Sequence, residues 1–191
     1  MNKDRYSIPG IEIDPNKILI IMVSEAPPEL SKDDFYSTGD PFYLRTTVQA
    51  FCDAGFKVSK MLDILDLGVY VTTAIKCAKK AYGILPQTVD NCSVRILEKE
   101  IDLFPETKVI LLMGDNAIRA MNFIAKRKTG KRLILSSPLY KARKGDYFYK
   151  GIRVFPTYLQ TGKSYLIEKS KAKMIAEDIR KALDATKRHL I

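Results

Sequence analysis

The sequence predicts a three-layer α/β/α sandwich built around a central four-stranded parallel sheet. Four short apolar runs are hydrophobic on both faces, which is typical of parallel strands that helices cover on both sides. The runs alternate with segments whose apolar residues recur at helical spacing, and this order favours parallel strands joined by helical crossovers. A chain of 191 residues is long enough to bury a sizeable core, so we expect a single domain over residues 1–191.

Each of the four predicted strands is a short run rich in aliphatic residues. In chain order the runs are "KILIIMV" (17–23), "GVYVTTAI" (68–75), "KVILLMG" (108–114) and "IRVFPTY" (152–158). The last run belongs to the segment "YFYKGIRVF", which predicts a hairpin that turns at Lys150-Gly151. Ligands of open parallel sheets bind beyond the carboxyl ends of the strands, so the residues after each run are the candidate site residues.

Four helices are expected between and after these strands. They span residues 42–54, 88–103, 115–127 and 164–187. Asp115 or Asn116 is expected to cap the third helix, because both side chains accept hydrogen bonds from the first turn. The last of these helices, at the C-terminal end of the chain, is expected to dock on the rest of the domain. The segment "KRKTGKR" (126–132) is expected to be a basic loop.

The chain carries a net charge of +10 that is unevenly distributed. Residues 1–114 hold 13 Lys and Arg against 16 Asp and Glu, a net −3, whereas residues 115–191 hold 19 against 6, a net +13. Between Lys126 and Arg153, ten basic and four aromatic residues accompany a single acid. Basic residues mixed with aromatic ones suit a polyanion with stackable bases, and a solvated basic face is the alternative.

Several classes of protein are disfavoured. No apolar run reaches the roughly 18 residues of a membrane helix, and no apolar segment follows the first charged residues, so we expect a cytoplasmic protein without a membrane partner. Three cysteines do not indicate a disulfide framework, and the single histidine, His189, argues against histidine-based metal sites and triads. The absence of Gly-x-Gly-x-x-Gly and Walker patterns after the strands disfavours those modes of nucleotide binding.

The first predicted strand ends in "SEAPP" (24–28), which is more than a simple turn requires. Its two prolines fix their own backbone and favour extended geometry in the residues before them. The result is a stiff loop with the Glu25 carboxylate at its mouth. Stiff loops at strand ends are common places for chemistry, so Glu25 is a candidate functional residue.

Six segments, taken in order, carry a family resemblance: "ILIIMVSEAPP", "STGDPFYLR", "VYVTTAIKC", "NC", "KVILLMGDNA" and "VFPTYLQTG". Together they resemble the uracil-DNA glycosylase superfamily, closest to its family 4 and 5 type, from Ile18 to about Leu166. The resemblance implies a four-stranded parallel sheet between helices. It also implies that the chain binds DNA, flips a modified base out of the helix and hydrolyses its N-glycosidic bond without a catalytic metal.

The resemblance assigns roles to residues near the first two strand ends. Glu25 is the candidate catalytic carboxylate, while Ala26 and Pro27 keep their places in a base-binding motif whose two glycines are replaced here. Phe42 matches the phenylalanine that stacks on the flipped base, and Thr73 stands where family members carry the asparagine that reads uracil. A modified base other than, or besides, uracil is therefore expected. Two other roles stay open: Glu25 as the cap of a loop N–H, and Phe42 as a core residue.

The fourth strand end lacks the histidine that helps family members to stabilise the departing base anion. Leu159 and Gln160 occupy that motif, so Gln160, Thr161 or Lys163 would have to donate the hydrogen bond, and Gln160 is the predicted catalytic residue. The predicted phosphate-binding residues are Thr161, Lys163, Ser164, Lys126, Arg127 and Lys128. An ordinary helix cap is the alternative role of the "QTGKS" turn.

No cofactor is expected. Cys77 and Cys92 resemble two ligands of the iron–sulfur cluster of family 4, but such a cluster needs four thiolates and the N-terminal pair is missing. Both are expected to be small core residues. A magnesium ion at Asp33, Asp34 and Asp40 is an alternative that requires these carboxylates to converge.

Three functions remain open. The first is a DNA-repair glycosylase of this superfamily, and the second is a non-catalytic member that binds nucleic acid without cutting it. The third is a hydrolase of free nucleosides or nucleotides, which would not need the basic second half of the chain. The sequence predicts neither the lesion, nor a preference for single or double strands, nor an oligomeric state.

Overall fold

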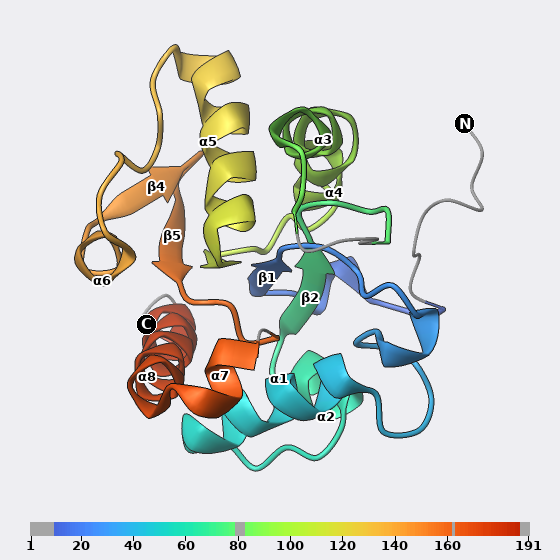
Figure 1. Ribbon diagram of the computed structural model, residues 1–191. Helices are drawn as coiled ribbons and strands as arrows, with labels where there is room; N and C mark the ends of the chain where they lie inside the picture. Colours follow the sequence, from blue (N-terminus) through green and yellow to red (C-terminus); the bar gives the residue numbers. More distant parts are fainter. Residues whose placement is uncertain (1–9, 79–82, 162, 188–191) are drawn as a thin grey trace.

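The computed structural model describes residues 10–78, 83–161 and 163–187, except for the side chains of residues 163 and 164. Its centre is a five-stranded sheet in the order β2-β1-β3-β5-β4 (Figure 1). The strands are β1 (Ile20–Ser24), β2 (Val69–Thr73), β3 (Val109–Met113), β4 (Tyr147–Tyr149) and β5 (Ile152–Thr157). All neighbouring strands except β4 and β5 pair in parallel, so the carboxyl ends of β1, β2, β3 and β5 meet at one edge.

Helices cover both faces of this sheet, as the sequence predicts (Figure 1). The helices are α1 (Phe42–Asp53), α2 (Met61–Asp66), α3 (Pro86–Cys92), α4 (Glu98–Ile101), α5 (Asp115–Thr129), α6 (Leu139–Ala142), α7 (Lys163–Ile167) and α8 (Lys169–Lys187). A π-helical segment, Ser93–Leu97, joins α3 to α4, and Pro15–Lys17 and Ser31–Asp33 form short 3₁₀ helices. Helices α1, α2 and α8 lie on one face, and α3, α4 and α5 lie on the other.

Successive residues of the central strands enter two different cores. Ile21 and Ile110 pack in the core that α3, α4 and α5 cover. Met22 and Leu111 pack in the core that α1, α2 and α8 cover. Because side chains alternate across a sheet, a strand that is buried on both faces is apolar at most positions. Every residue of β1, β2 and β3 is buried, which confirms the three-layer prediction.

The sheet has five strands rather than the four expected. The predicted hairpin exists, because Tyr149 pairs with Ile152 across a two-residue turn at Lys150 and Gly151, both with positive φ. Its first arm, β4, adds an antiparallel edge strand to the sheet. Phe148 in this strand is 58% exposed, so β4 lacks the two-sided burial by which the other strands were recognised.

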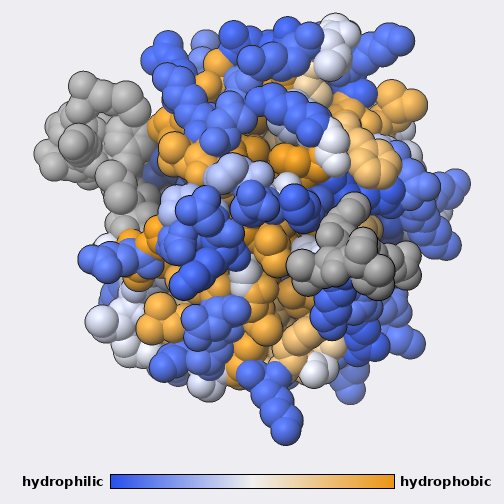
Figure 2. Space-filling view, turned by 180° about the vertical axis from the view of Figure 1, so that it is seen from behind, coloured by the Kyte–Doolittle hydropathy of each residue, from blue (hydrophilic) through white to orange (hydrophobic). Residues whose placement is uncertain are grey.

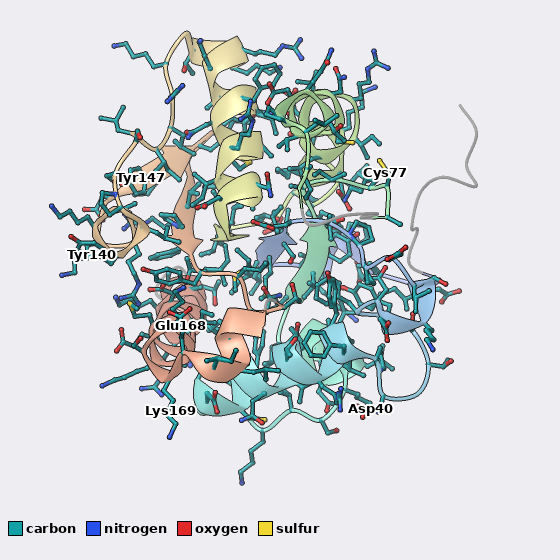
Figure 3. The ribbon with its side chains drawn as sticks, in the orientation of Figure 1. Asp40, Cys77, Tyr140, Tyr147, Glu168 and Lys169 are labelled. Carbon is teal, nitrogen blue, oxygen red and sulfur yellow. The ribbon has the colours of Figure 1, made fainter. Side chains whose placement is uncertain are left out.

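The predicted helices are present with three differences. The segment 88–103 divides into α3, the π-helical segment and α4, and the segment 164–187 divides into α7 and α8. Glu168 and Lys169 mark the junction of α7 and α8 (Figure 3). The predicted basic loop 126–132 is wrong in its first half, because α5 continues to Thr129 and ends at Gly130. Helices α2 and α6 were not anticipated.

The edge strand β2 is closed by a side chain rather than by another strand. The Tyr36 hydroxyl donates to the carbonyl of Val71 and accepts its N–H, each at 3.0 Å. An unpaired edge strand invites pairing with another chain, and a hydroxyl that satisfies both groups removes part of that opportunity. Tyr36 therefore completes the sheet at the edge opposite β4.

None of the helices among the described residues combines the length and the hydrophobicity needed to cross a membrane. Figure 2 shows the face turned away from the viewer in Figure 1, with hydrophilic side chains above and below and hydrophobic ones exposed between them. The exposed large apolar side chains include Leu135 and Phe148, which lie in different segments.

Candidate active site at the carboxyl edge of the sheet

The loop after β1 is tied to the segment that follows β2. The carbonyl of Ser24 accepts the N–H of Ala74 at 2.8 Å, and the carbonyl of Glu25 accepts the N–H of Ile75 at 3.0 Å. The two strands thus continue to pair beyond their assigned ends. Pro27 has no N–H to donate and lies buried, so the loop is held by its carbonyls and by packing.

The Glu25 carboxylate lies at the N-terminus of α5. The backbone N–H of Asn116 donates to its Oε1 at 3.3 Å. The expected cap by Asp115 or Asn116 is therefore wrong, because Gly114 is the N-cap residue and the acceptor comes from the loop after β1. The first N–H groups of a helix lack intrahelical partners and attract negative charge, which explains the position of Glu25.

Gly114 creates the space that this carboxylate occupies. Its φ of +91° favours glycine, and a Cβ here would lie 2.7 Å from Oε1 of Glu25. The same Cβ would lie 3.2 Å from Cβ of Leu159, in the loop after β5. The loops that follow β1, β3 and β5 therefore meet around Glu25, as the parallel topology predicts.

Gln160 and Thr161 turn toward α1 rather than into solvent. The side chain of Gln160 is completely buried, and its amide Nε2 donates to the Thr47 hydroxyl at 3.5 Å. Its Oε1 has no hydrogen-bond partner among the described residues. Thr161 hydrogen-bonds with Tyr43, the second residue of α1. The predicted catalytic role of Gln160 thus belongs to a buried amide, one of whose two N–H groups already has a partner.

Tyr43 is a site residue that the sequence did not reveal. Burial raises the pKa of its hydroxyl, the hydrogen bond with Thr161 opposes this, and the negative charges of Asp34, Glu25 and Asp33 raise the pKa further. The negative charge of Glu25 therefore acts on the Tyr43 hydroxyl. The available signal was its position directly after the phenylalanine in "GDPFY", at the start of a helix.

Phe42 lies next to Tyr43 at the first position of α1. Its ring is half-buried, 6.3 Å from the Tyr43 ring, with the Arg45 guanidinium 6.0 Å from its centroid. Arg45 also forms an ion pair with Asp40 at 3.5 Å. The two roles left open for Phe42 are therefore compatible, because the residue begins the helix and still leaves part of its ring accessible.

Thr73 lies beside Glu25 as expected, because it pairs with Ser24 across β1 and β2. Its hydroxyl donates to the carbonyl of Ile75 at 2.6 Å, and the residue is only 5% exposed. The hydroxyl retains acceptor capacity alone. Ala26 and Pro27, the other predicted base-binding residues, are buried in the loop after β1.

The predicted phosphate-binding residues do not form one group. Lys126, Arg127 and Lys128 lie in the last turn of α5, and Asn116 lies in its first. Ten residues of helix separate Asn116 from Lys126, which is about 15 Å. Lys128 forms an ion pair with Glu98 at 3.0 Å. Lys163 and Ser164 begin α7, but their side chains lie outside the described residues.

The aromatic residues of the basic segment stack with neighbouring cations. The Arg153 guanidinium lies 5.0 Å from the centroid of the exposed Phe148 ring. The Lys141 ammonium lies 5.9 Å from the Tyr140 ring. Tyr140 in α6 and Tyr147 in β4 lie on the same side of the molecule (Figure 3). The basic and aromatic residues predicted from 126 to 153 thus extend over α5, α6 and the hairpin.

Cys77 and Cys92 lie close enough for their thiols to hydrogen-bond. Burial raises the pKa of Cys77, and the interaction with Cys92 raises it further. Cys77 lies in the loop after β2 (Figure 3). Within the described part of the chain, no three His, Cys, Asp or Glu side chains gather closely enough to hold a metal ion, so the magnesium alternative gains no support.

A second polar cluster, which the sequence did not reveal, lies under the segment after β2. The Lys76 ammonium contacts Glu100 Oε2 and the Thr72 hydroxyl, each at 2.5 Å. The hydroxyls of Tyr70 and Thr72 both donate to the other oxygen of Glu100 at 2.8 Å. Burial lowers the pKa of Lys76, whereas the charge of Glu100 raises it. The cluster joins β2 to α4.

Comparison with known families agrees with this arrangement. The model of the uracil DNA glycosylase superfamily matches residues 12–181, so the chain belongs to that superfamily. A comparison with curated proteins found none that matches. Membership confirms the resemblance seen in the strand-end motifs, while the family 4 and 5 type remains a prediction. Members of this superfamily act on DNA.

Proposed function

We propose that the chain is a base-excision glycosylase that flips a modified base out of DNA and hydrolyses its N-glycosidic bond. The observation that carries the proposal is the position of Glu25. Its carboxylate is held by the N–H of Asn116 at the carboxyl edge of a parallel sheet, where three strand-end loops meet. A carboxylate at such a position suits a reaction that develops positive charge on a sugar.

Glu25 would act on the sugar side of the reaction. A water oxygen bonds to the anomeric carbon, the glycosidic bond breaks, and its electron pair leaves with the nitrogen of the base. Glu25 orients that water, accepts its proton and opposes the positive charge of the sugar. The base departs as an anion and takes a proton from solvent. Phe42 supplies a partly accessible ring for stacking on the flipped base.

Thr73 would read the edge of the base as an acceptor. Its proton is already donated to the carbonyl of Ile75, so only its lone pairs remain for a ligand. A base edge with an N–H group therefore suits this position. Uracil, hypoxanthine and xanthine all carry such a group, and they form the substrate panel that the proposal requires.

The test is release of a base from duplexes that each carry one of these three lesions. Wild-type protein should produce abasic sites from at least one duplex, and Glu25→Gln should lower the rate by about 100-fold or more, which is the usual contribution of a general base. Glu29→Gln is the matched control, because Glu29 is exposed in the same loop. No abasic product from any of the three duplexes at high protein concentration would overturn the proposal.

A non-catalytic member that only binds nucleic acid is the second candidate, and one observation favours it. Leu159, close to Gly114 and therefore to Glu25, carries no hydrogen-bond donor for a departing base. The nearby Gln160 amide is buried against Thr47. This candidate predicts salt-sensitive binding of DNA without base release, and unchanged binding in Glu25→Gln.

A further inference from the structure

A pocket of about 590 Å³ lies along α5, away from the Glu25 carboxylate itself. One wall consists of α5 residues from Asn116 to Lys126, and the other consists of residues 132–139. The chain runs back beside α5 after Gly130 and reaches α6, as Figure 1 shows. The volume falls within the range of about 300 to 1,000 Å³ that is typical of ligand sites.

The two walls are held together by a side chain that also lines the pocket. The Nδ2 of Asn122 donates to the carbonyl of Ile134 at 2.9 Å, and its Oδ1 accepts the N–H of the same residue at 2.7 Å. Ile134 is 3% exposed and packs in the core beneath α5. The pocket is therefore formed in advance of any ligand, which lowers the cost of binding.

The charges of the pocket are separated along its length. Arg119 and Asp90 form an ion pair at 3.3 Å and largely neutralise each other. Asp115 lies at the first turn of α5. Lys126 and Arg132 line the opposite end, and neither forms an ion pair among the described residues. Two cations without partners in a preformed pocket favour a ligand that carries several negative charges.

The pocket adjoins the candidate active site through one residue. Asn116 lines the pocket, and its backbone N–H donates to the Glu25 carboxylate. From Asn116 to Lys126, α5 rises by about 15 Å. The pocket is therefore longer than a single nucleotide, and its cationic end lies away from Glu25.

We propose that this pocket receives the sugar–phosphate backbone of the DNA strand that flanks the flipped nucleotide, with Lys126 and Arg132 each neutralising a phosphate. Ile118 and Phe123 supply apolar surface for the sugars. The direction assigned to the DNA strand rests on the proposed function, because the flipped nucleotide is placed at Glu25 and the flanking backbone runs from there. The binding of the backbone itself requires no catalysis.

The test compares two double variants that remove the same charge. Lys126→Ala/Arg132→Ala changes two cations that line the pocket. Lys131→Ala/Lys173→Ala changes two exposed cations, neither of which lines it. Binding of a labelled, undamaged duplex is measured by fluorescence anisotropy over a range of salt concentrations. Thermal melting of both variants checks that they fold.

Two lost phosphate contacts should reduce the slope of log K against log salt by about 1.8, since each contributes about 0.9. The control should change the slope by less than half of that, because its cations act only through the general field. Equal slopes in the two variants would overturn the proposal. Inorganic phosphate that displaces the duplex at an equal concentration of phosphate groups would also overturn it, because the pocket would then bind the free ion rather than the DNA backbone. Because the binding experiment uses undamaged DNA, its outcome does not depend on base release. Base release is tested separately with the lesion-bearing duplexes.

Discussion

The position of Glu25 depends on three separate segments of the chain. Its backbone carbonyl accepts the N–H of Ile75, its carboxylate accepts the N–H of Asn116, and the missing side chain of Gly114 leaves room for it. A group fixed in this way loses little freedom when a substrate arrives, which is what electrostatic stabilisation of a transition state requires. The geometry of one carboxylate thus links β1, β2 and β3.

Replacing Gly114 should disturb this carboxylate more than it disturbs the fold. Gly114→Ala forces a side chain into a φ of +91° and brings its Cβ to 2.7 Å from Glu25 Oε1. We expect a loss of about 1 to 3 kcal/mol in the free energy of unfolding and a loss of base release, because Glu25 must move. Urea denaturation and the lesion-duplex assay measure the two effects.

Gly130→Ala is the matched control at the other end of α5. Gly130 also has a positive φ, +75°, but an added Cβ would meet nothing within 4 Å. It should lose comparable stability through backbone strain and keep its rate of base release. A wild-type rate in Gly114→Ala would show that Glu25 does not need its present position.

At the residue scale, the sequence predicted which candidate site residues lie close together better than it predicted what each residue does. Glu25 follows β1 and Thr73 ends the neighbouring parallel strand β2, so their proximity was predictable from the order of the strands. The contribution of Tyr43 was not predictable, because its interaction with Thr161 joins the first turn of α1 to the loop after β5. The two roles left open for Glu25 also prove compatible, since it caps the Asn116 N–H at the edge of the candidate site.

At the scale of elements, the Lys76–Glu100 ion pair fastens the edge strand β2 to α4. Removing one partner leaves the other charge buried and unpaired, so Glu100→Ala should lower the free energy of unfolding by about 3 to 5 kcal/mol. Asp102→Ala is the control two residues later, where both partners of the ion pair with Lys150 are half-exposed, and it should cost about 1 kcal/mol or less. Urea midpoints measured by circular dichroism compare them, and equal losses would contradict the prediction.

Long helices and strands that are buried on both faces were predictable from the sequence. Short helices and strands that are buried on one face were not. The strand β3 is apolar at every position and β1 is apolar from Ile20 to Val23, and α1 and α5 have clear amphipathic spacing. In contrast, α2 spans only Met61–Asp66, and it depends on the Asp63 carboxylate, which accepts the N–H groups of Ser59 and Lys60. Such local contacts between side chains and backbone carry no periodic signal in the sequence.

At the scale of the whole molecule, the fold brings acidic residues of the first part of the chain into contact with basic residues of the second part. Several surface ion pairs join an acid of residues 1–114 to a base of residues 115–191, as in Asp90–Arg119, Glu98–Lys128 and Asp102–Lys150. The acids of the first part thus neutralise some cations of the second. Lys126 and Arg132 remain without such partners among the described residues, and for this reason net charge alone could not locate the proposed DNA contacts.

Stability of the whole domain should fall at alkaline pH because of two buried tyrosines. Burial raises the pKa of Tyr36 well above its ordinary value of 10.0, with the backbone of Val71 opposing this and the charges of Asp34 and Glu100 adding to it. Burial also raises the pKa of Tyr70, and the charge of Glu100 and its hydrogen bond raise it further. Both hydroxyls therefore keep their protons in the folded protein at pH values where the unfolded chain has lost them.

The sign of the effect follows from the number of bound protons. Above about pH 10 the unfolded state binds fewer protons than the folded state, so the free energy of unfolding decreases as pH rises, by up to about 1.4 kcal/mol per pH unit for each tyrosine. Tyr36→Phe/Tyr70→Phe should be less stable at neutral pH, because it loses the hydroxyl contacts with Val71 and Glu100. Its stability should nevertheless fall less steeply between about pH 10 and pH 11, since it lacks the two protons that only the folded wild-type protein keeps in this range. Urea midpoints across this range provide the slopes, and parallel slopes would show that these hydroxyls do not control alkaline unfolding.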